Sequence, residues 1–209
     1  MHSNQNRVNT YLNKESFDMS SIALPPIVER TPYTDNKYLP FKAHDDKAPE
    51  FLPIGGKTLV RQTSSTHGPD GYITIDPDTI AKNQARLRNK IHSARKRITL
   101  FEESIKENSD TLIISYGVTS RAVKDAAKNL EKKNKPVSTL TLKTLWPVPE
   151  DLLKEKAKSF KKIIVIEMNL GQYVNEIDRV LKEKTVKFYG QMNGVLISPA
   201  KIEEVIENA

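Results

Sequence analysis

The 209-residue sequence contains no cysteine. A disulfide framework, a zinc–thiolate site or an iron–sulfur cluster therefore cannot be built from this chain alone, and any redox centre must belong to a partner. No apolar run approaches the roughly 20 residues that a helix needs to cross a bilayer. The N-terminal residues lack the basic-then-apolar order of a signal peptide. We therefore expect a cytoplasmic protein without membrane contact.

Motifs for phosphate binding and nucleophilic catalysis are also missing. No G-x-G-x-x-G follows a predicted strand, and no G-x-x-x-x-G-K-[ST] occurs, so nothing indicates a nucleotide-phosphate cradle. There is no G-D-G diphosphate motif and no G-x-S-x-G nucleophile elbow. The four histidines are widely spaced, which argues against a metal site. We expect no catalytic residue and no bound metal in this chain by itself.

The formal charge of +7 is compatible with nucleic acid, an acidic protein partner or a well-solvated surface. Most lysines lie on the polar faces of predicted helices, which favours the solvated surface. Residues 82–97 carry seven basic residues and no acidic one. This stretch has no aromatic residue for stacking on bases and no known nucleic-acid-binding motif, so we expect no nucleic acid partner.

The residue distribution divides the chain into three segments. Residues 1–79 hold most of the twelve prolines and half of the eight glycines, which predicts an extended arm that lies on another surface. Near-heptad spacing of apolar residues then predicts a connecting helix in residues 80–106. Residues 107–209 form an α/β domain. The apolar residues of the connecting helix are Ile80, Leu87, Ile91, Ile98 and Phe101.

The α/β domain follows from a regular alternation of strand and helix patterns. Crossovers of about 20 residues require parallel strands, because antiparallel neighbours are joined by short hairpins. A last helix begins with Ser198 as N-cap and Pro199 at the first helical position. We expect a parallel sheet with flanking helices. The predicted strands are Thr111–Tyr116, Val137–Leu142, Ile163–Ile166 and Val186–Tyr189, and the helices between them are Arg121–Leu130, Asp151–Phe160 and Gln172–Leu181.

Two places could carry chemistry. Polar residues follow the strands at the carboxyl edge of the sheet, where ligands of open parallel sheets bind. They could hold a ligand or a partner loop, or they could simply end strands and form turns. The second place is the polar loop of residues 63–72, which could meet a polar ligand or be a solvated turn. The edge residues are Ser115, Glu167, Asn169, Gln191 and Asn193.

Five segments, in this order and spacing, carry a family resemblance that runs from roughly Ser16 to the end. They are THGPDGYITIDPDTIAKNQARLRNKI, DTLIISYGVTSRAVKDA, LKTLWPVPEDLL, VIEMNLGQYVNEI and YGQMNG. The sequence resembles the C-terminal part of the α subunit of 2-oxoacid:ferredoxin oxidoreductases. The resemblance implies a fold like the transketolase C-terminal domain. It also implies a chain that begins just after the thiamin-binding domain, with TYLNKESF resembling the last strand of that domain.

The family oxidatively decarboxylates a 2-oxoacid to an acyl-CoA and passes two electrons to ferredoxin. The resemblance implies thiamin diphosphate with magnesium, 4Fe–4S clusters in the complex and coenzyme A as co-substrate, with no cofactor bound by this chain alone. The implied partners are a thiamin-binding α domain or subunit, a β subunit, a cluster-bearing subunit and ferredoxin. The loop spelling is most similar to the 2-oxoglutarate or general 2-oxoacid branch.

The resemblance also assigns residues. Substrate-side contacts are expected from Thr66, His67, Asp70 and Gly71, although HGPDG departs from the commoner HDExG spelling and leaves Asp70 as the candidate carboxylate. Two turns are expected to make structural contacts between domains or subunits. Their residues are Glu167, Asn169, Gly171, Gln172, Gln191, Asn193 and Gly194. The alternative is a stand-alone transketolase-like regulatory or interaction domain, and the sequence leaves open whether the chain is a natural split subunit or a fragment.

Overall fold

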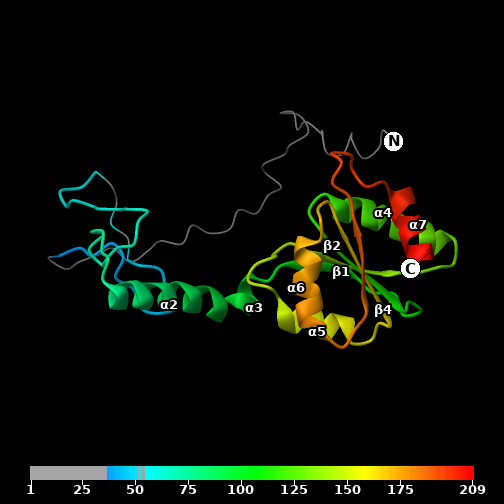
Figure 1. Ribbon diagram of the computed structural model, residues 1–209, viewed down its shortest axis with the longest axis horizontal. Helices are drawn as coiled ribbons and strands as arrows, with labels where there is room; N and C mark the ends of the chain where they lie inside the picture. Colours follow the sequence, from blue (N-terminus) through cyan, green and yellow to red (C-terminus); the bar gives the residue numbers. More distant parts are fainter. Residues whose placement is uncertain (1–36, 51, 53–54) are drawn as a thin grey trace, which may run out of the picture. The chain divides into compact units, whose positions relative to one another are not determined.

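The computed structural model in Figure 1 describes residues 37–50, 52 and 55–209. Within them the chain forms two compact units, residues 37–97 and residues 98–209. The segment TYLNKESF and much of the predicted arm lie outside the described residues. Between residues 37 and 76, the β interaction that the structure describes is an isolated bridge from His67 to Ile73.

A five-stranded sheet of order β1-β3-β2-β4-β5 organises the second unit. Strands β2 to β5 run parallel, so the predicted parallel core is confirmed. Each of these strands lies within one residue of its predicted bounds at either end. The strands are β1 (Phe101–Ser104), β2 (Thr111–Tyr116), β3 (Ser138–Leu142), β4 (Lys162–Glu167) and β5 (Val186–Gly190).

The predicted connecting helix of residues 80–106 is wrong at its C-terminal end. Helix α2 (Pro77–Ser93) is followed by the short α3 (Arg95–Ile98), and the chain then enters β1, which pairs antiparallel with β3. The Thr144 hydroxyl donates to the Ile98 carbonyl (2.6 Å) and accepts from the Leu100 amide (3.1 Å). These bonds use backbone groups that a continued helix would need, so a contact with a residue 46 positions away along the chain ends it.

Helices cover both faces of the sheet (Figure 1). Side chains of α5 and α6 pack in one hydrophobic cluster with Leu112, Ile163 and Val165. Side chains of α4 and α7 pack in the second cluster with Ile113, Ile164 and Ile166. Alternate residues of β2 and β4 therefore fill opposite layers, as the pleat of a strand requires. The helices are α4 (Thr119–Lys132), α5 (Glu150–Ala157), α6 (Gln172–Val180) and α7 (Pro199–Glu207).

Polar contacts fix α7 against α4. The Ser198 side chain accepts from the Lys201 amide at 3.2 Å, which confirms the predicted N-cap. Glu203, only 9% exposed, accepts from Asn129 (2.8 Å) and Lys133 (2.7 Å) of the α4 end. These two donors hold the pKa of Glu203 below its usual value.

None of the helices in the described part of the chain is long and apolar enough to span a membrane.

Glu102 anchors the edge strand β1 through ion pairs with Lys124 and Lys143, which lower its pKa from 4.5 to about 2. The ion pairs therefore stabilise the fold above pH 4.5, and this contribution is lost as the pH falls toward 2. We expect Glu102→Gln to lose less stability across this window than the natural protein, measured by chemical denaturation. Glu107→Gln, at an exposed position, is the control. Identical acid profiles for the Glu102 variant and the natural protein would contradict this role.

Candidate functional site

Glu167 ends β4 and is fully buried. Its carboxylate accepts hydrogen bonds from the Tyr116 hydroxyl (2.6 Å) and the Asn169 amide group (2.8 Å). It also accepts from the backbone amides of Tyr173 (3.2 Å) and Val174 (2.8 Å), in the first turn of α6. A buried carboxylate is tolerated when its oxygens are fully hydrogen-bonded, and a negative charge is favourable at a helix N-terminus. Glu167 thus joins β2, β4 and α6.

The turn after β4 is built by Asn169. Its side-chain oxygen accepts from the backbone amides of Gly171 (2.7 Å) and Gln172 (3.2 Å). Gly171 has φ 96°, a left-handed conformation that favours glycine. A side chain added there would also press on Val174, whose nearest atom lies 3.1 Å from the ideal Cβ position. The four predicted interface residues in this turn, Glu167 included, therefore make a rigid entry into α6.

Two tyrosines complete this network. Burial, followed by the hydrogen bond to Glu167, raises the pKa of Tyr116 to about 12. Burial also raises the pKa of Tyr173, whose hydroxyl donates to the Leu145 carbonyl at 3.0 Å. Their rings meet edge to face with centroids 5.5 Å apart. Both hydroxyls stay protonated at neutral pH, so they serve as hydrogen-bond donors and not as bases.

The turn after β5 lies beside the first one. The backbone amide of Gln191 donates to the backbone carbonyl of Glu167 at 3.2 Å. The side-chain amide of Gln191 donates to the Val195 carbonyl at 2.7 Å. Asn193 accepts from the Val195 amide (3.1 Å), and Gly194 has φ 78°. The structure therefore brings together the two groups of predicted interface residues. Their described hydrogen bonds build the two turns that end β4 and β5.

Ser115, like Glu167, is fully buried. It differs from the other edge residues because its hydroxyl has no hydrogen-bond partner among the described residues. It therefore does not belong to an exposed polar rim, which was one of the two interpretations of the sequence. Strand alternation explains the position, because Ser115 points away from the side on which Tyr116 reaches Glu167.

The loops at the carboxyl edge carry exposed apolar side chains, which we call the apolar rim. They are Trp146 (64% exposed), Leu170 (70% exposed), Met192 and Val195. They follow β3, β4 and β5, and the carboxyl ends of parallel strands meet at the same edge of a sheet. Groups of exposed apolar side chains of this kind are typical of protein interfaces.

The predicted substrate-side residues lie in the other unit, in a hairpin of residues 66–74. The Thr66 hydroxyl donates to the Thr74 carbonyl at 2.8 Å. Asp70 accepts from the Tyr72 amide (3.0 Å), and Gly71, at φ 83°, donates its amide to the Gly68 carbonyl (3.1 Å). Asp70 and Gly71 thus form the reverse turn that was one interpretation of the sequence.

His67 stacks on Phe41, with ring centroids 3.7 Å apart. Its Nδ1 lies 3.0 Å from the Gly68 carbonyl oxygen. Because a carbonyl oxygen only accepts hydrogen bonds, Nδ1 carries a proton in this contact. In the neutral ring Nε2 is then an acceptor. The hairpin therefore brings all four predicted residues together and orients one imidazole.

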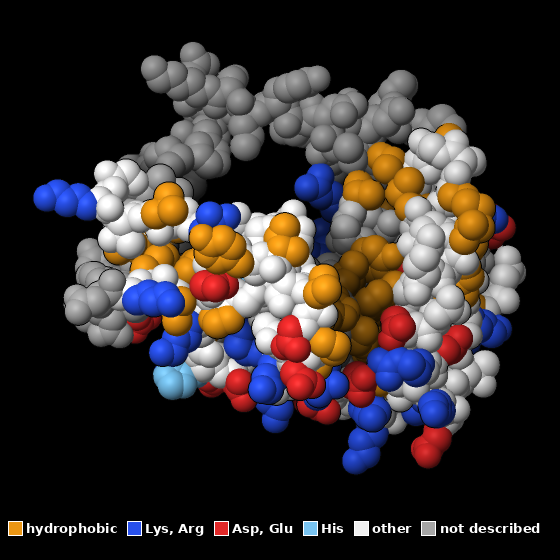
Figure 2. Space-filling model, turned by 60° about the vertical axis from the view of Figure 1, so that its left-hand side comes forward, with side chains coloured by type: hydrophobic (Ala, Val, Ile, Leu, Met, Phe, Trp, Pro, Cys, Tyr) orange, Lys and Arg blue, Asp and Glu red, His pale blue; other side chains and the backbone are white. Residues whose placement is uncertain are grey.

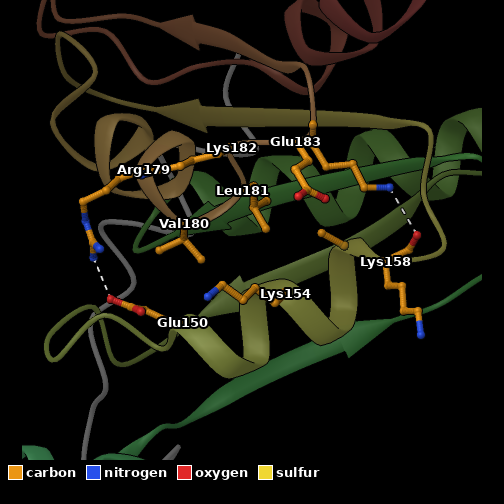
Figure 3. A pocket seen from close by; sticks show the side chains of 10 residues that line it. Glu150, Lys154, Lys158, Arg179, Val180, Leu181, Lys182 and Glu183 are labelled. Carbon is orange, nitrogen blue, oxygen red and sulfur yellow. Dashed lines mark hydrogen bonds and ion pairs between the residues drawn. The ribbon is translucent and has the colours of Figure 1, made fainter.

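A groove of about 570 Å³ lies between α5 and the C-terminal end of α6 (Figure 3). Its lining includes the apolar side chains of Val180 and Leu181. Arg179 pairs with Glu150 at 2.9 Å, and Lys184 donates to backbone carbonyls. Cations at helix C-termini offset the partial negative charge of the unpaired carbonyl groups. The basic side chains here are explained by the helix ends and do not by themselves indicate an anion site.

No group of three or more histidine, aspartate or glutamate side chains that could hold a metal ion occurs in the described residues. Tyr116 and Tyr173 belong to the hydrogen-bond network around Glu167, which we call the edge network, although the sequence did not predict a role for them. A tyrosine at the end of a strand and another at the start of a helix gave a weak signal in the sequence. Their pairing depends on β2 and β4 being neighbours, which the sequence order does not reveal.

Comparison with known proteins defines the class of this domain. Residues 109–202 match the family Pyruvate:ferredoxin oxidoreductase core domain II. The chain is 38% identical over 165 residues to the 2-oxoglutarate synthase subunit KorA of Methanocaldococcus jannaschii, covering 78% of this chain and 44% of that one. It is 32% identical over 172 residues to the same subunit of Methanothermobacter thermautotrophicus, covering 81% and 46%.

Solved structures share this fold, and one of them aligns over most of the chain. The 2-oxoglutarate:ferredoxin oxidoreductase from Magnetococcus marinus, with 2-oxoglutarate, coenzyme A and succinyl-CoA bound, has a TM-score of 0.72 and 22% identity. The match covers 88% of this chain and 32% of that one. The chain belongs to the 2-oxoacid:ferredoxin oxidoreductase family, which confirms the resemblance seen in the sequence. It spans less than half the length of the two curated relatives.

Replacement of Glu167 tests the edge network. In Glu167→Gln, one acceptor oxygen becomes an amide donor that faces the existing donors, so we expect the free energy of unfolding to fall by about 3 kcal/mol. Glu183→Gln, which changes an exposed glutamate, should alter it by less than about 0.5 kcal/mol. The measurement is urea denaturation at pH 7. Equal midpoints and slopes for the two variants would show that the network contributes little.

Proposed function

We propose that this chain forms the C-terminal half of the α subunit of a thiamin diphosphate-dependent 2-oxoacid:ferredoxin oxidoreductase that acts on 2-oxoglutarate. The observation that carries the proposal is the similarity to two 2-oxoglutarate synthase subunits over more than three quarters of the chain. The proposed reaction converts 2-oxoglutarate and coenzyme A to succinyl-CoA and carbon dioxide. The two electrons released reduce two ferredoxins by one electron each.

The residues of this chain do not fit the cofactors of that reaction. The chain has no cysteine to ligate a 4Fe–4S cluster and no diphosphate-binding motif for thiamin diphosphate with magnesium. We therefore assign these groups to other polypeptides of the complex. The proposed partners are a thiamin-binding α domain or subunit, a β subunit, a cluster-bearing subunit and, through the complex, ferredoxin. Coenzyme A is a co-substrate of the whole assembly.

The proposed task of the α/β unit is assembly. The apolar rim offers a surface that another polypeptide can cover, and the turns at Glu167–Gln172 and Gln191–Gly194 support it. Because Glu167 and Asn169 hydrogen-bond the backbone of the first turn, Leu170 is presented on a rigid loop and not on a flexible one. Rigid presentation lowers the entropy lost when the interface forms.

The hairpin of residues 66–74 is the proposed substrate-side element. His67 offers Nε2 as a hydrogen-bonding group, with its ring held by Phe41 and by the Gly68 carbonyl. Asp70 already uses one carboxylate oxygen to hold the turn, so its proposed part is to shape the loop that carries Thr66 and His67.

Purification from the native cells through an affinity tag tests the assembly. We expect thiamin-binding and iron–sulfur polypeptides to co-purify, and the product to reduce a viologen dye when 2-oxoglutarate and coenzyme A are added. Pyruvate and 2-oxoisovalerate are the control substrates. If the chain is recovered alone while a longer α subunit carries the activity, the proposal is wrong.

Variants of the hairpin test the substrate-side role within that complex. We expect His67→Ala to lower kcat/KM for 2-oxoglutarate by about tenfold or more, because a positioned hydrogen bond is lost. Asp70→Asn keeps an acceptor for the Tyr72 amide, so it should leave kcat/KM nearly unchanged if Asp70 only shapes the turn. His44→Ala, at an exposed histidine of the same unit, is the control. A value of kcat/KM within twofold of the natural one for His67→Ala would remove His67 from the site.

A further inference from the structure

Positive charge is concentrated in one of the two units. Residues 37–97 contain twelve lysines and arginines against six aspartates and glutamates, an excess of six out of the net +7 of the whole chain. Seven of these basic residues fall between residues 82 and 97, where no acidic residue occurs. Helices α2 and α3 occupy almost all of that stretch. The charge is thus presented on a defined helical segment.

Four of the basic side chains on this segment are solvent-exposed, namely Lys82, Arg88, Lys96 and Arg97. They form no ion pair within the described part of the chain. The nearest acidic residues in the sequence, Asp76 and Asp78, lie at the N-terminal end of α2, where Asp76 caps the helix by accepting from the Thr79 amide. Lys82 interacts electrostatically with Asp76, but no acidic residue occurs from residue 82 to residue 97, so most of the positive charge on this segment is not neutralised by its own helices.

Apolar side chains are exposed on the same unit. Ile73 is 67% exposed and Ile75 is 91% exposed. They are two positions apart in an extended segment that leads into α2, so they point to the same side. Leu87 of α2 is also exposed, and α2 has no buried residue. Figure 2 shows one face of the molecule, on which hydrophobic side chains lie among basic and acidic ones.

Among the described residues, the two hydrophobic clusters contain no residue of 37–97. The described part of this unit therefore lacks an apolar core of its own. Exposed apolar side chains beside unpaired cations are best covered by a polypeptide that supplies both apolar and acidic groups. Nucleic acid would satisfy only the charge, and residues 82–97 offer it no aromatic side chain for stacking.

We propose that the exposed segment of residues 73–97, which carries Ile73, Ile75 and Leu87 among basic side chains such as Lys82, Arg88 and Lys96, binds an acidic surface of another polypeptide of the enzyme. The inference rests on the proposed function. In the curated relatives, more than half of the polypeptide lies outside the matched part, so those proteins contain further chain that could cover such a segment. Charge complementarity favours an acidic strip on that polypeptide, flanked by apolar residues.

Cross-linking of the complex purified through the tagged chain locates the partner surface. A carbodiimide joins a lysine amine directly to a carboxylate, so it reports ion pairs at contact distance. We expect Lys82 and Lys96 to be joined to aspartate or glutamate residues of a co-purified polypeptide, identified by mass spectrometry. Cross-links from these lysines to this chain alone would overturn the inference.

Charge reversal then measures the contribution of the surface. We expect the triple variant K82E/R88E/K96E to bind the partner polypeptides at least about tenfold more weakly at low salt, with a smaller difference at high salt. The matched control is K128E/K132E/K182E, which reverses three exposed lysines of the other unit and changes the net charge equally. Circular dichroism and thermal melting check that both variants fold.

The outcomes separate this inference from the proposed function. If the complex assembles and both triple variants bind it equally well, the inference is wrong while the proposed function stands. The purified protein could instead retain RNA, which would be seen as absorbance at 260 nm. If ribonuclease removes this absorbance and K82E/R88E/K96E lacks it, the basic segment binds RNA and the assignment of an acidic polypeptide is overturned. If no enzyme polypeptide co-purifies, both proposals fail together.

Discussion

The carboxyl edge of the sheet depends on the hydrogen bonds made by the buried carboxylate of Glu167. A fully buried charge is costly unless its oxygens accept hydrogen bonds. Here four donors, from β2, from the turn after β4 and from α6, bind the carboxylate oxygens. The same contacts set the start of α6 and hold the loop that presents Leu170. The Glu167 backbone carbonyl also accepts from Gln191, which ties the loop after β5 to this centre. The side chain of Glu167 thus organises the loop after β4, and its backbone carbonyl organises the loop after β5.

The two units handle apolar residues in different ways. The unit of residues 98–209 buries them in two clusters on opposite faces of the sheet. In the described part of residues 37–97, large apolar side chains such as Ile75 are exposed beside basic ones. One unit is thus stabilised by its own core, whereas the described part of the other is organised by turns, one bridge and a capped helix. This difference is the physical basis for assigning a partner surface to the second.

Local patterns predicted much of the α/β fold because short strand patterns alternate with helices that each carry one apolar stripe. The same reasoning failed at Phe101, where near-heptad spacing favoured a longer helix. The spacing was real, but Phe101 pairs with Leu142 and packs on the core instead. A residue far along the chain, Thr144, takes the backbone hydrogen bonds that would have extended the helix. Helix propensity is a local preference, and a long-range contact overrides it here.

The sequence by itself determined the family, the four parallel strands and the positions of the turns, because turn residues and strand periodicity are encoded within a few positions. It could also show that cluster ligands are missing, since that is a matter of composition. Only the tertiary structure decided which edge residues face inward. Ser115 and Glu167 became buried, whereas Leu170 stayed exposed, because burial depends on which strands are neighbours. The order β1-β3-β2-β4-β5 is a property of the folded chain and brings Tyr116 to Glu167 across 51 positions of sequence.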